Sequence, residues 1–414
     1  MVISDSRLRR WAVPMGVLTG MLLAGCAGTD DSSTTAADTD EHPEESSNLV
    51  EAPTPRLVAT YDGGVLVLDA ETLDVVDDIA LDGFNRLNPA GDGRHVLIST
   101  AAAFRALDTG VWTEQDGEQR HYAEEPALTD IEFDTERPGH VVSHAGKTVL
   151  FSDGTGQIEI FETYALDGTK PDTEIVMAED PHHGVAVELE NGGLLVTLGT
   201  EESRTGVKVL DAERDEITRN EDCPGVHGEA MAADEAIVIG CQDGVLVYHD
   251  GTITKIDSPD EYGRIGNQAG SEESSVVLGD YKVDPDADLE RPERISLIDT
   301  TTNTLELVDL DASYTFRSLA RGPAGEALIL GTDGAIHVVD PDSAEVVSTI
   351  PVIGEWEEPM DWQQPRPTIF VQGDIAYVTD PSTDELHAVD LSAGTIVNSA
   401  ELPATPNELT GVSG

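Results

Sequence analysis

The sequence predicts an all-β fold, a β-propeller built from four-stranded blades. From residue 56 onward, short runs rich in β-branched residues alternate with Gly-, Asp- and Asn-rich turns, and strongly helical stretches are missing. The repeat has a period of about 35–50 residues with four strands per unit, which is typical of propellers. One phrase, an alternating apolar strand that ends in Asp, recurs in residues 64–69, 206–211, 295–299, 335–340 and 386–390.

We count eight repeat units, and seven is the alternative because the second and third units are irregular. The strands of a unit are lettered a to d from the propeller axis outward. The innermost strands are expected to start near Phe84, Leu128, His183, Val226, Ile265, Thr315, Arg366 and Asn407. The first unit begins at its strand b, so we expect residues 408–412 at the C-terminus to supply its strand a. This closure would remove the edges that an open sheet exposes.

The first 26 residues have the pattern of a lipoprotein signal peptide. Arg7, Arg9 and Arg10 precede an apolar run, residues 11–22, that is too short to span a bilayer. The following Leu-Ala-Gly-Cys resembles a bacterial lipobox, which predicts lipidation of Cys26 and an extracytoplasmic, membrane-anchored protein. An ordinary secretory signal is the alternative.

Residues 27–55 are rich in Thr, Asp, Ser, Glu and Pro and have no apolar periodicity, so we expect a disordered acidic tether. The tether contains His42, and residues 56–414 form the predicted propeller domain. The chain has 81 acidic and 23 basic residues and a net charge of −58. This charge excludes nucleic acid as a partner, and we expect a monomer that meets the membrane through its lipid anchor alone.

With Cys26 lipidated, Cys223 and Cys241 remain, and in an oxidising compartment a disulfide is expected. A loop of this size would contribute roughly 3 kcal/mol of stability. The alternative is a pair of thiolate metal ligands.

Several histidines are predicted to gather on one face of the propeller. In our strand assignment the d-to-a connections, the b-to-c hairpins and the starts of strand a share an upper face. Four contiguous blades bring His121, His144, His183 and His227 to it, and a second tier of candidates is His182, Asp130, Glu124 and Glu229. The same assignment puts His95 and His140 on the lower face and His249, His337 and His387 away from the axis.

Neutral imidazoles converging within about 2.0–2.1 Å of one ion form a zinc site, and a carboxylate can complete or orient it. The alternative for each histidine is a hydrogen bond to a neighbouring carbonyl. We expect His183 and His227 to be close neighbours, because each opens a strand a and each is followed by glycine.

Residues 83–95, 181–185, 222–230 and 278–282 resemble the AztD-type zinc metallochaperones, β-propeller proteins that pass zinc to the solute-binding protein of a zinc ABC importer. The resemblance extends over about residues 59–412. It implies zinc as the bound metal, delivery to such a solute-binding protein, and the two His-Gly motifs as zinc ligands. Family members can carry a His-rich N-terminal segment, whereas this tether has only His42.

Two other functions compete with the zinc carrier. A metal-dependent propeller hydrolase or lactonase would need an open coordination position and a general base such as Glu229. A metal-free scaffold would bind partner proteins on its faces. The sequence has no nucleophile motif, phosphate loop or HExxH motif, so we do not expect an enzyme.

Overall fold

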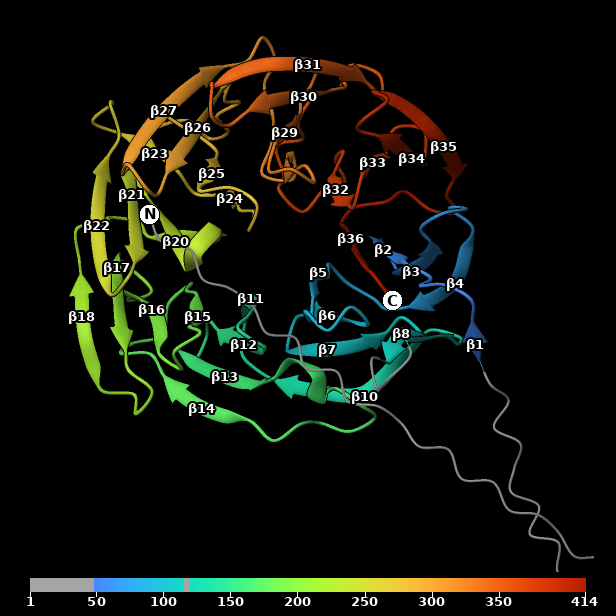
Figure 1. The fold of residues 1–414 in the computed structure, drawn as a ribbon, viewed down its shortest axis with the longest axis horizontal. Coiled ribbons are helices and arrows are strands. Elements are labelled where there is room, and N and C mark those ends of the chain that lie inside the picture. The colour runs from blue at the N-terminus through green and yellow to red at the C-terminus, as the bar shows by residue number, and fades with distance from the viewer. Residues whose placement is uncertain (1–47, 115–118) are drawn as a thin grey trace, which may run out of the picture. The chain divides into compact units, whose positions relative to one another are not determined.

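The computed structural model describes residues 48–114 and 119–414, which fold almost entirely as strands. Eight sheets of at least four strands follow one another along this part of the chain, and neighbouring sheets contact each other in a ring (Figure 1). The predicted β-propeller fold is confirmed. Cys26 and His42 lie outside the described residues, and no helix among the described residues has the length and apolarity needed to cross a bilayer.

Each sheet has one strand near the axis and three strands outside it. The innermost strands are β36 (Leu409–Val412), β5 (Arg86–Pro89), β11 (Pro138–His144), β15 (Ala186–Glu188), β19 (His227–Ala232), β24 (Gln268–Ala269), β28 (Leu319–Arg321) and β32 (Ile369–Gln372). The second strands are β2 (Arg56–Tyr61), β6 (His95–Ser99), β12 (Lys147–Ser152), β16 (Leu194–Gly199), β20 (Ala236–Cys241), β25 (Val276–Gly279), β29 (Ala327–Leu330) and β33 (Ile375–Asp380).

The outer half of each sheet completes the antiparallel order. The third strands are β3 (Gly64–Asp69), β7 (Ala103–Asp108), β13 (Gln157–Glu162), β17 (Arg204–Leu210), β21 (Asp243–His249), β26 (Arg294–Asp299), β30 (Ala335–Asp340) and β34 (Glu385–Asp390). The outermost strands are β4 (Val75–Ala80), β10 (Ala127–Asp134), β14 (Glu174–Met177), β18 (Glu216–Asn220), β22 (Thr252–Asp257), β27 (Thr304–Asp309), β31 (Glu345–Pro351) and β35 (Thr395–Glu401).

The remaining elements are short. Strand β23 (Gly263–Arg264) pairs with β21, and two 3₁₀ turns, η1 (Thr163–Ala165) and η2 (Ala233–Glu235), connect strands. The first sheet is closed as predicted, because β36 pairs with β2 in the register Arg56↔Val412 to Ala59↔Leu409. The two ends of the propeller domain therefore share one sheet.

The second blade differs from the sequence-based assignment. Strands β8 (Val111–Glu114) and β9 (Arg120–Ala123) leave the blade and form a separate sheet, in which β9 pairs with both β8 and β1 (Leu49–Val50). Residues 48–55 of the predicted tether therefore belong to the described structure. Strand β10, which contains Leu128, pairs with β7 and is the outermost strand of the second blade. The prediction that Leu128 starts an innermost strand was wrong, and the innermost strand of the third blade is β11.

This correction reverses the predicted direction of residues 138–144. Successive strands of a blade run in opposite directions. The sequence-based assignment made this strand the second of its blade, but it is the first, so it runs in the direction opposite to the predicted one. His140 and His144 lie near opposite ends of β11. The reversal therefore exchanges the faces to which the two histidines were assigned.

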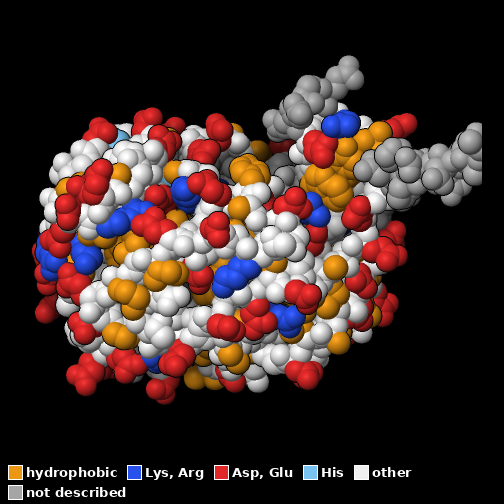
Figure 2. All heavy atoms as spheres, turned by 90° about the horizontal axis from the view of Figure 1, so that it is seen from below, with side chains coloured by type: hydrophobic (Ala, Val, Ile, Leu, Met, Phe, Trp, Pro, Cys, Tyr) orange, Lys and Arg blue, Asp and Glu red, His pale blue; other side chains and the backbone are white. Residues whose placement is uncertain are grey.

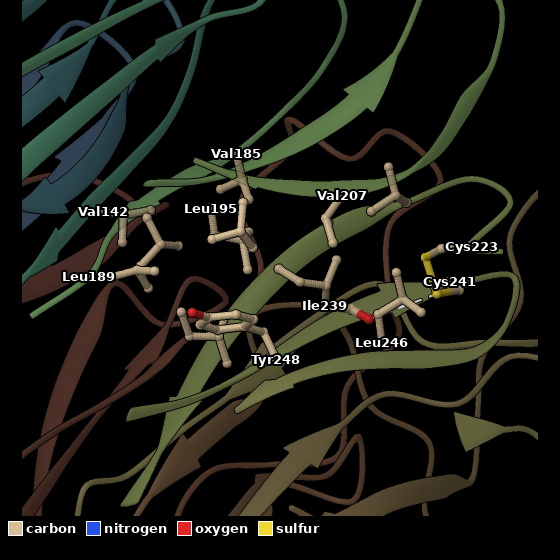
Figure 3. Packing of buried hydrophobic residues seen from close by; sticks show 14 residues of the cluster. Val142, Val185, Leu189, Leu195, Val207, Cys223, Ile239, Cys241, Leu246 and Tyr248 are labelled. Atoms are coloured by element: carbon tan, nitrogen blue, oxygen red, sulfur yellow. Dashed lines mark hydrogen bonds between the residues drawn. A yellow bond between two sulfur atoms is a disulfide. The ribbon is translucent and has the colours of Figure 1, made fainter. Parts of the chain in front are cut away.

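The hydrophobic core lies between neighbouring sheets. In the cluster of Figure 3, Val207 and Leu195 from the fourth sheet pack against Ile239 and Leu246 from the fifth. Acidic side chains are spread over the visible surface in Figure 2, with fewer basic ones among them. The packed strands form a rigid scaffold, and the loops that connect them lie at the surface of each face, where functional residues are commonly placed.

Candidate metal centre

Three histidines from three consecutive blades converge near the axis. His140 lies in β11, His183 lies in the connection that leads to β15, and His227 is the first residue of β19. Each offers one ring nitrogen, and these three atoms lie within 4.8 Å of one another. Within residues 48–114 and 119–414, no other three His, Cys, Asp or Glu residues bring ligand atoms this close.

The His183 and His227 rings face each other through their Nε2 atoms, which are 3.2 Å apart. Two ligands at zinc–nitrogen distances of about 2.0–2.1 Å on a tetrahedral ion are themselves separated by about 3.3 Å. The distance between the two imidazoles therefore suits a single bridging ion, and the expectation that these histidines are close neighbours agrees with the structure.

The partners of the Nδ1 atoms fix the orientation of both rings. His183 Nδ1 is 2.6 Å from Asp153 Oδ2, and His227 Nδ1 is 2.6 Å from the Gly266 carbonyl oxygen. Both partners are acceptors, so both Nδ1 atoms carry the proton. The two Nε2 lone pairs then point toward each other, an arrangement that a cation between them would stabilise.

His140 completes the cluster from the neighbouring blade. Its ring centroid is 5.2 Å from that of His183 and 6.0 Å from that of His227. His140 Nδ1 lies 3.3 Å from Glu229 Oε2, which leaves its Nε2 for an ion. Glu229 therefore has the position of a carboxylate that orients a metal-bound histidine.

Electrostatics keep His227 in the form that binds metals. Burial lowers the pKa of His227 well below its usual value, and the charges of His140, His183 and Arg264 lower it further. The hydrogen bond to Gly266 opposes this shift without reversing it. His227 is therefore a neutral imidazole at neutral pH, as metal coordination requires.

Backbone irregularities place two of the three rings. The pairing of β19 with β20 shifts register between His227 and Glu229, and the intervening Gly228 has a φ of +70°. A Cβ on Gly228 would come within 2.8 Å of the Gly266 carbonyl oxygen that orients His227. The pairing of β11 with β12 also shifts register, between Pro138 and Val141, which brackets His140. Such bulges re-aim side chains near functional sites.

A buried carboxylate supports the loop that holds His227. Asp280, which is 1% exposed, accepts hydrogen bonds from the backbone N–H groups of Gly266 (2.6 Å) and Asn267 (3.0 Å). This fixes the Gly266 carbonyl group and, through it, the His227 ring. The role accounts for one of the distinctive stretches of the sequence, residues 278–282.

The sequence is similar to that of a known zinc chaperone. No known protein family profile matches the sequence. The zinc chaperone AztD of Citrobacter koseri is 24% identical over 370 residues, which cover 84% of this chain and 85% of the relative. The chain resembles AztD over most of its length. The resemblance expected from the sequence is confirmed.

Solved structures of AztD have the same fold. A crystal structure of Citrobacter koseri AztD aligns with a TM-score of 0.77 at 22% identity, covering 88% of this chain and 99% of that one. Its apo form gives a TM-score of 0.76 at 23% identity, with 88% and 100% covered. The dihydro-heme d1 dehydrogenase NirN is more distant, with a TM-score of 0.53 at 12% identity and coverage of 86% and 74%. AztD is named as a chaperone, which fits the expectation that this chain is not an enzyme.

Two of the four predicted ligands lie elsewhere. His121 is in β9 of the separate sheet, where its Nδ1 is 2.8 Å from Thr113 Oγ1. His144 ends β11 away from the cluster, and its Nδ1 is 2.7 Å from the Glu188 carbonyl oxygen. The structure brings neither residue to the pair His183 and His227.

The second-tier candidates also separate. His182 is buried and bonded on both sides, by Nδ1 to the Asp180 carbonyl oxygen and by Nε2 to Thr197 Oγ1, so it has a packing role. Asp130 and Glu124 are exposed and outside the cluster, whereas Glu229 contacts the cluster through His140. Asp153 was missed by sequence reasoning, because the same strand miscount made the β12–β13 hairpin a c-to-d turn on the lower face, whereas it is a b-to-c hairpin on the upper face.

The disulfide between Cys223 and Cys241 is present as predicted (Figure 3). Both cysteines are fully buried, and Cys223 lies four residues before His227. The bond ties the connection that enters β19 to the end of β20. It therefore stabilises the backbone from which His227 projects, and it removes both sulfurs from consideration as thiolate ligands.

The cluster opens into a pocket of about 230 Å³ near the axis. Its lining also includes Arg86, Phe316 and Leu319. The pocket is large enough for an ion with water or with one incoming ligand group. Three imidazoles with one free coordination position suit an ion that must be exchanged.

Proposed function

We propose that this protein is an extracytoplasmic zinc-binding metallochaperone that carries Zn²⁺ on His140, His183 and His227. The observation that carries the proposal is the 3.2 Å separation of two Nε2 atoms whose rings are both fixed by acceptors at Nδ1. The name of the relative, zinc chaperone AztD, supports zinc as the cargo.

In this proposal, the zinc ion is transferred to the solute-binding protein of a zinc ABC importer. All three ligands are imidazoles, the two cysteines are joined in a disulfide, and one coordination position stays open. Such a site can release zinc by stepwise ligand exchange, because an incoming group binds before a histidine departs. A lipid anchor at Cys26 would hold the carrier at the membrane, near the importer.

Zinc titration of wild type and variants tests the site. We expect His183→Ala/His227→Ala to lose more than about 100-fold in zinc affinity, because one ligand cannot hold the ion. His140→Ala should weaken binding less, because two imidazoles remain. His144→Gln is the matched control, a histidine of the same strand outside the cluster, and should bind zinc like wild type.

The double variant can also overturn the proposal. If the double variant binds zinc as tightly as wild type, the cluster is not the zinc site. Metal analysis of wild type purified without added zinc separates the zinc carrier from a metal-free scaffold, which would contain none.

A further inference from the structure

Arg204 and Arg264 lie beside the histidine cluster without a carboxylate partner among the described residues. Every other arginine of the described ranges forms an ion pair, except Arg321, which donates to backbone carbonyl groups. Acidic residues outnumber basic ones 81 to 23 in this chain. Two guanidinium groups without carboxylates beside the site therefore need an explanation.

Arg204 lies on the His183 side of the site. It begins β17, next to the hairpin that β16 and β17 form, and its half-buried side chain has an Nη1 atom that is buried without a hydrogen-bond partner. Burial and the charge of Arg264 lower the pKa of Arg204, while Asp153, the partner of His183, raises it. Arg204 thus has both Arg264 and Asp153 as electrostatic neighbours.

Arg264 lies on the His227 side. A Cβ on Gly266 would come within 2.3 Å of Arg264 Nη1, so the guanidinium group lies directly against the residue whose carbonyl oxygen orients His227. Lys282 is opposite Arg264 in an antiparallel bridge, with N–O distances of 2.8 and 3.0 Å. Like charges placed opposite each other destabilise a strand pair unless an anion compensates them.

We propose that Arg204 and Arg264 bind a carboxylate group of the protein that receives the zinc. The inference rests on the proposed function and specifies the chemistry of the acceptor. A guanidinium group presents a fork of donors that matches a carboxylate. Arg264 lies against Gly266, which orients His227, and Arg204 is an electrostatic neighbour of Asp153, which orients His183, so a carboxylate bound to the two arginines would approach the ion.

The arrangement also solves an electrostatic problem of docking. A carrier with a net charge of −58 repels an acidic partner over most of its surface. The guanidinium groups of Arg204 and Arg264 attract a carboxylate of the acceptor and suppress other orientations. The carboxylate oxygen then takes the fourth coordination position while the three histidines still hold the zinc.

Two chelators that differ in charge test this proposal on the zinc-loaded protein. EDTA attacks through carboxylates, whereas TPEN is neutral and attacks through pyridine and amine nitrogens. We expect Arg204→Gln/Arg264→Gln to slow zinc removal by EDTA about tenfold, because the attracting charges and donors are gone. Removal by TPEN should be unchanged. Arg204→Lys/Arg264→Lys keeps the charge and the fold but lacks the fork, and it should also be slower with EDTA.

Arg105→Gln/Arg120→Gln is the matched control, since it removes two positive charges from the second blade and the separate sheet. The proposal would be overturned if this control and Arg204→Gln/Arg264→Gln slowed zinc removal by EDTA equally. It would also be overturned if Arg204→Gln/Arg264→Gln slowed zinc removal by EDTA and by TPEN equally. A third outcome would also overturn the proposal. If acetate changes the absorption of the cobalt-loaded protein while the rate of zinc removal by EDTA does not depend on the two arginines, the site binds only a small free anion. Zinc content is measured first, and a wild type without zinc would instead contradict the proposed function.

Discussion

The histidine side and the arginine side of the propeller axis use equivalent positions of the fold in different ways. His183 precedes the innermost strand of its blade by three residues, as Arg366 does. Arg366, 1% exposed, donates to Glu358 Oε1 at 2.8 Å and to the Asp361 carbonyl oxygen at 2.7 Å. His183 instead donates from Nδ1 and directs Nε2 toward another Nε2.

The comparison separates a structural polar group from a functional one. Arg317, on the same side as Arg366, donates to Glu408 at 2.9 Å, and burial lowers its pKa to about 10 although Glu408 opposes the shift. Its charge is compensated within the protein, as expected of internal charge balance. The histidines are held in orientation while their lone pairs face one another, which favours an external cation.

The largest expected effect on stability comes from the arginine side. Glu358→Gln leaves Arg366 buried without its counter-charge, which should lower the free energy of unfolding by about 3–5 kcal/mol. Zinc affinity should stay at the wild-type value. Urea denaturation and a zinc titration of the same sample check both statements. A parallel loss of zinc affinity would show that the two sides are coupled and would break the comparison.

Removal of the disulfide should have the next largest effect. Cys223→Ser/Cys241→Ser should lower the free energy of unfolding by about 3 kcal/mol, because the unfolded chain regains the freedom of the closed loop. Zinc binding should weaken modestly, since the disulfide holds the connection that enters β19 at His227. Thermal unfolding and zinc titration measure the two effects. Unchanged stability would mean that packing alone fixes this connection.

The carboxylate behind His183 tests the histidine side in isolation. Asp153→Asn should weaken zinc binding about 10–100-fold, because it changes the acceptor that orients the ring. The free energy of unfolding should change by less than about 1 kcal/mol. The matched control is Asp92→Asn, because Asp92 Oδ2 binds His95 Nδ1 at the same 2.6 Å outside the cluster. Asp92→Asn should leave zinc affinity unaltered, and a loss there would point to a general effect of Asp–His pairs.

Features set by short stretches of sequence could be predicted. The recurring strands, the closure of the first sheet and the Cys223–Cys241 bond each follow from local patterns or from composition. The proximity of His183 and His227 followed as well, because the same His-Gly phrase opens two consecutive blades. Repetition turns a local pattern into a spatial relation.

The third histidine could not be found in this way. Strand β8 has the length and composition of an outermost strand, but it pairs with β9 in the separate sheet instead of with β7. Which strand completes a sheet depends on pairing between distant segments, and here β10 pairs with β7 after the intervening β8–β9 hairpin. The sequence-based assignment counted one strand too early and so reversed the direction of β11. It therefore placed His144 at the site and His140 away from it.

The smallest expected effect concerns an ion pair outside the histidine cluster. Arg94 donates to both Asp108 oxygens, at 2.9 and 2.6 Å, and both side chains are about one-fifth exposed. Asp108→Asn should lower the free energy of unfolding by about 1.5 kcal/mol at neutral pH. This is less than for Glu358→Gln, because water reaches the pair.

The effect of Asp108→Asn should also depend on pH. Burial raises the pKa of Asp108, but the hydrogen bonds from Arg94 and the Gly110 N–H group outweigh burial, and the net shift is downward. The unfolded chain therefore binds a proton at higher pH than the folded protein does. Stability from Asp108 is complete above the unfolded value of about 3.9 and is lost as the pH falls below it. Urea denaturation near neutral pH and near pH ~3.5 should show a smaller difference between wild type and variant in acid. The same difference at both values would mean that the interaction does not depend on the carboxylate charge, and the distinction between buried and half-buried pairs would then need another cause.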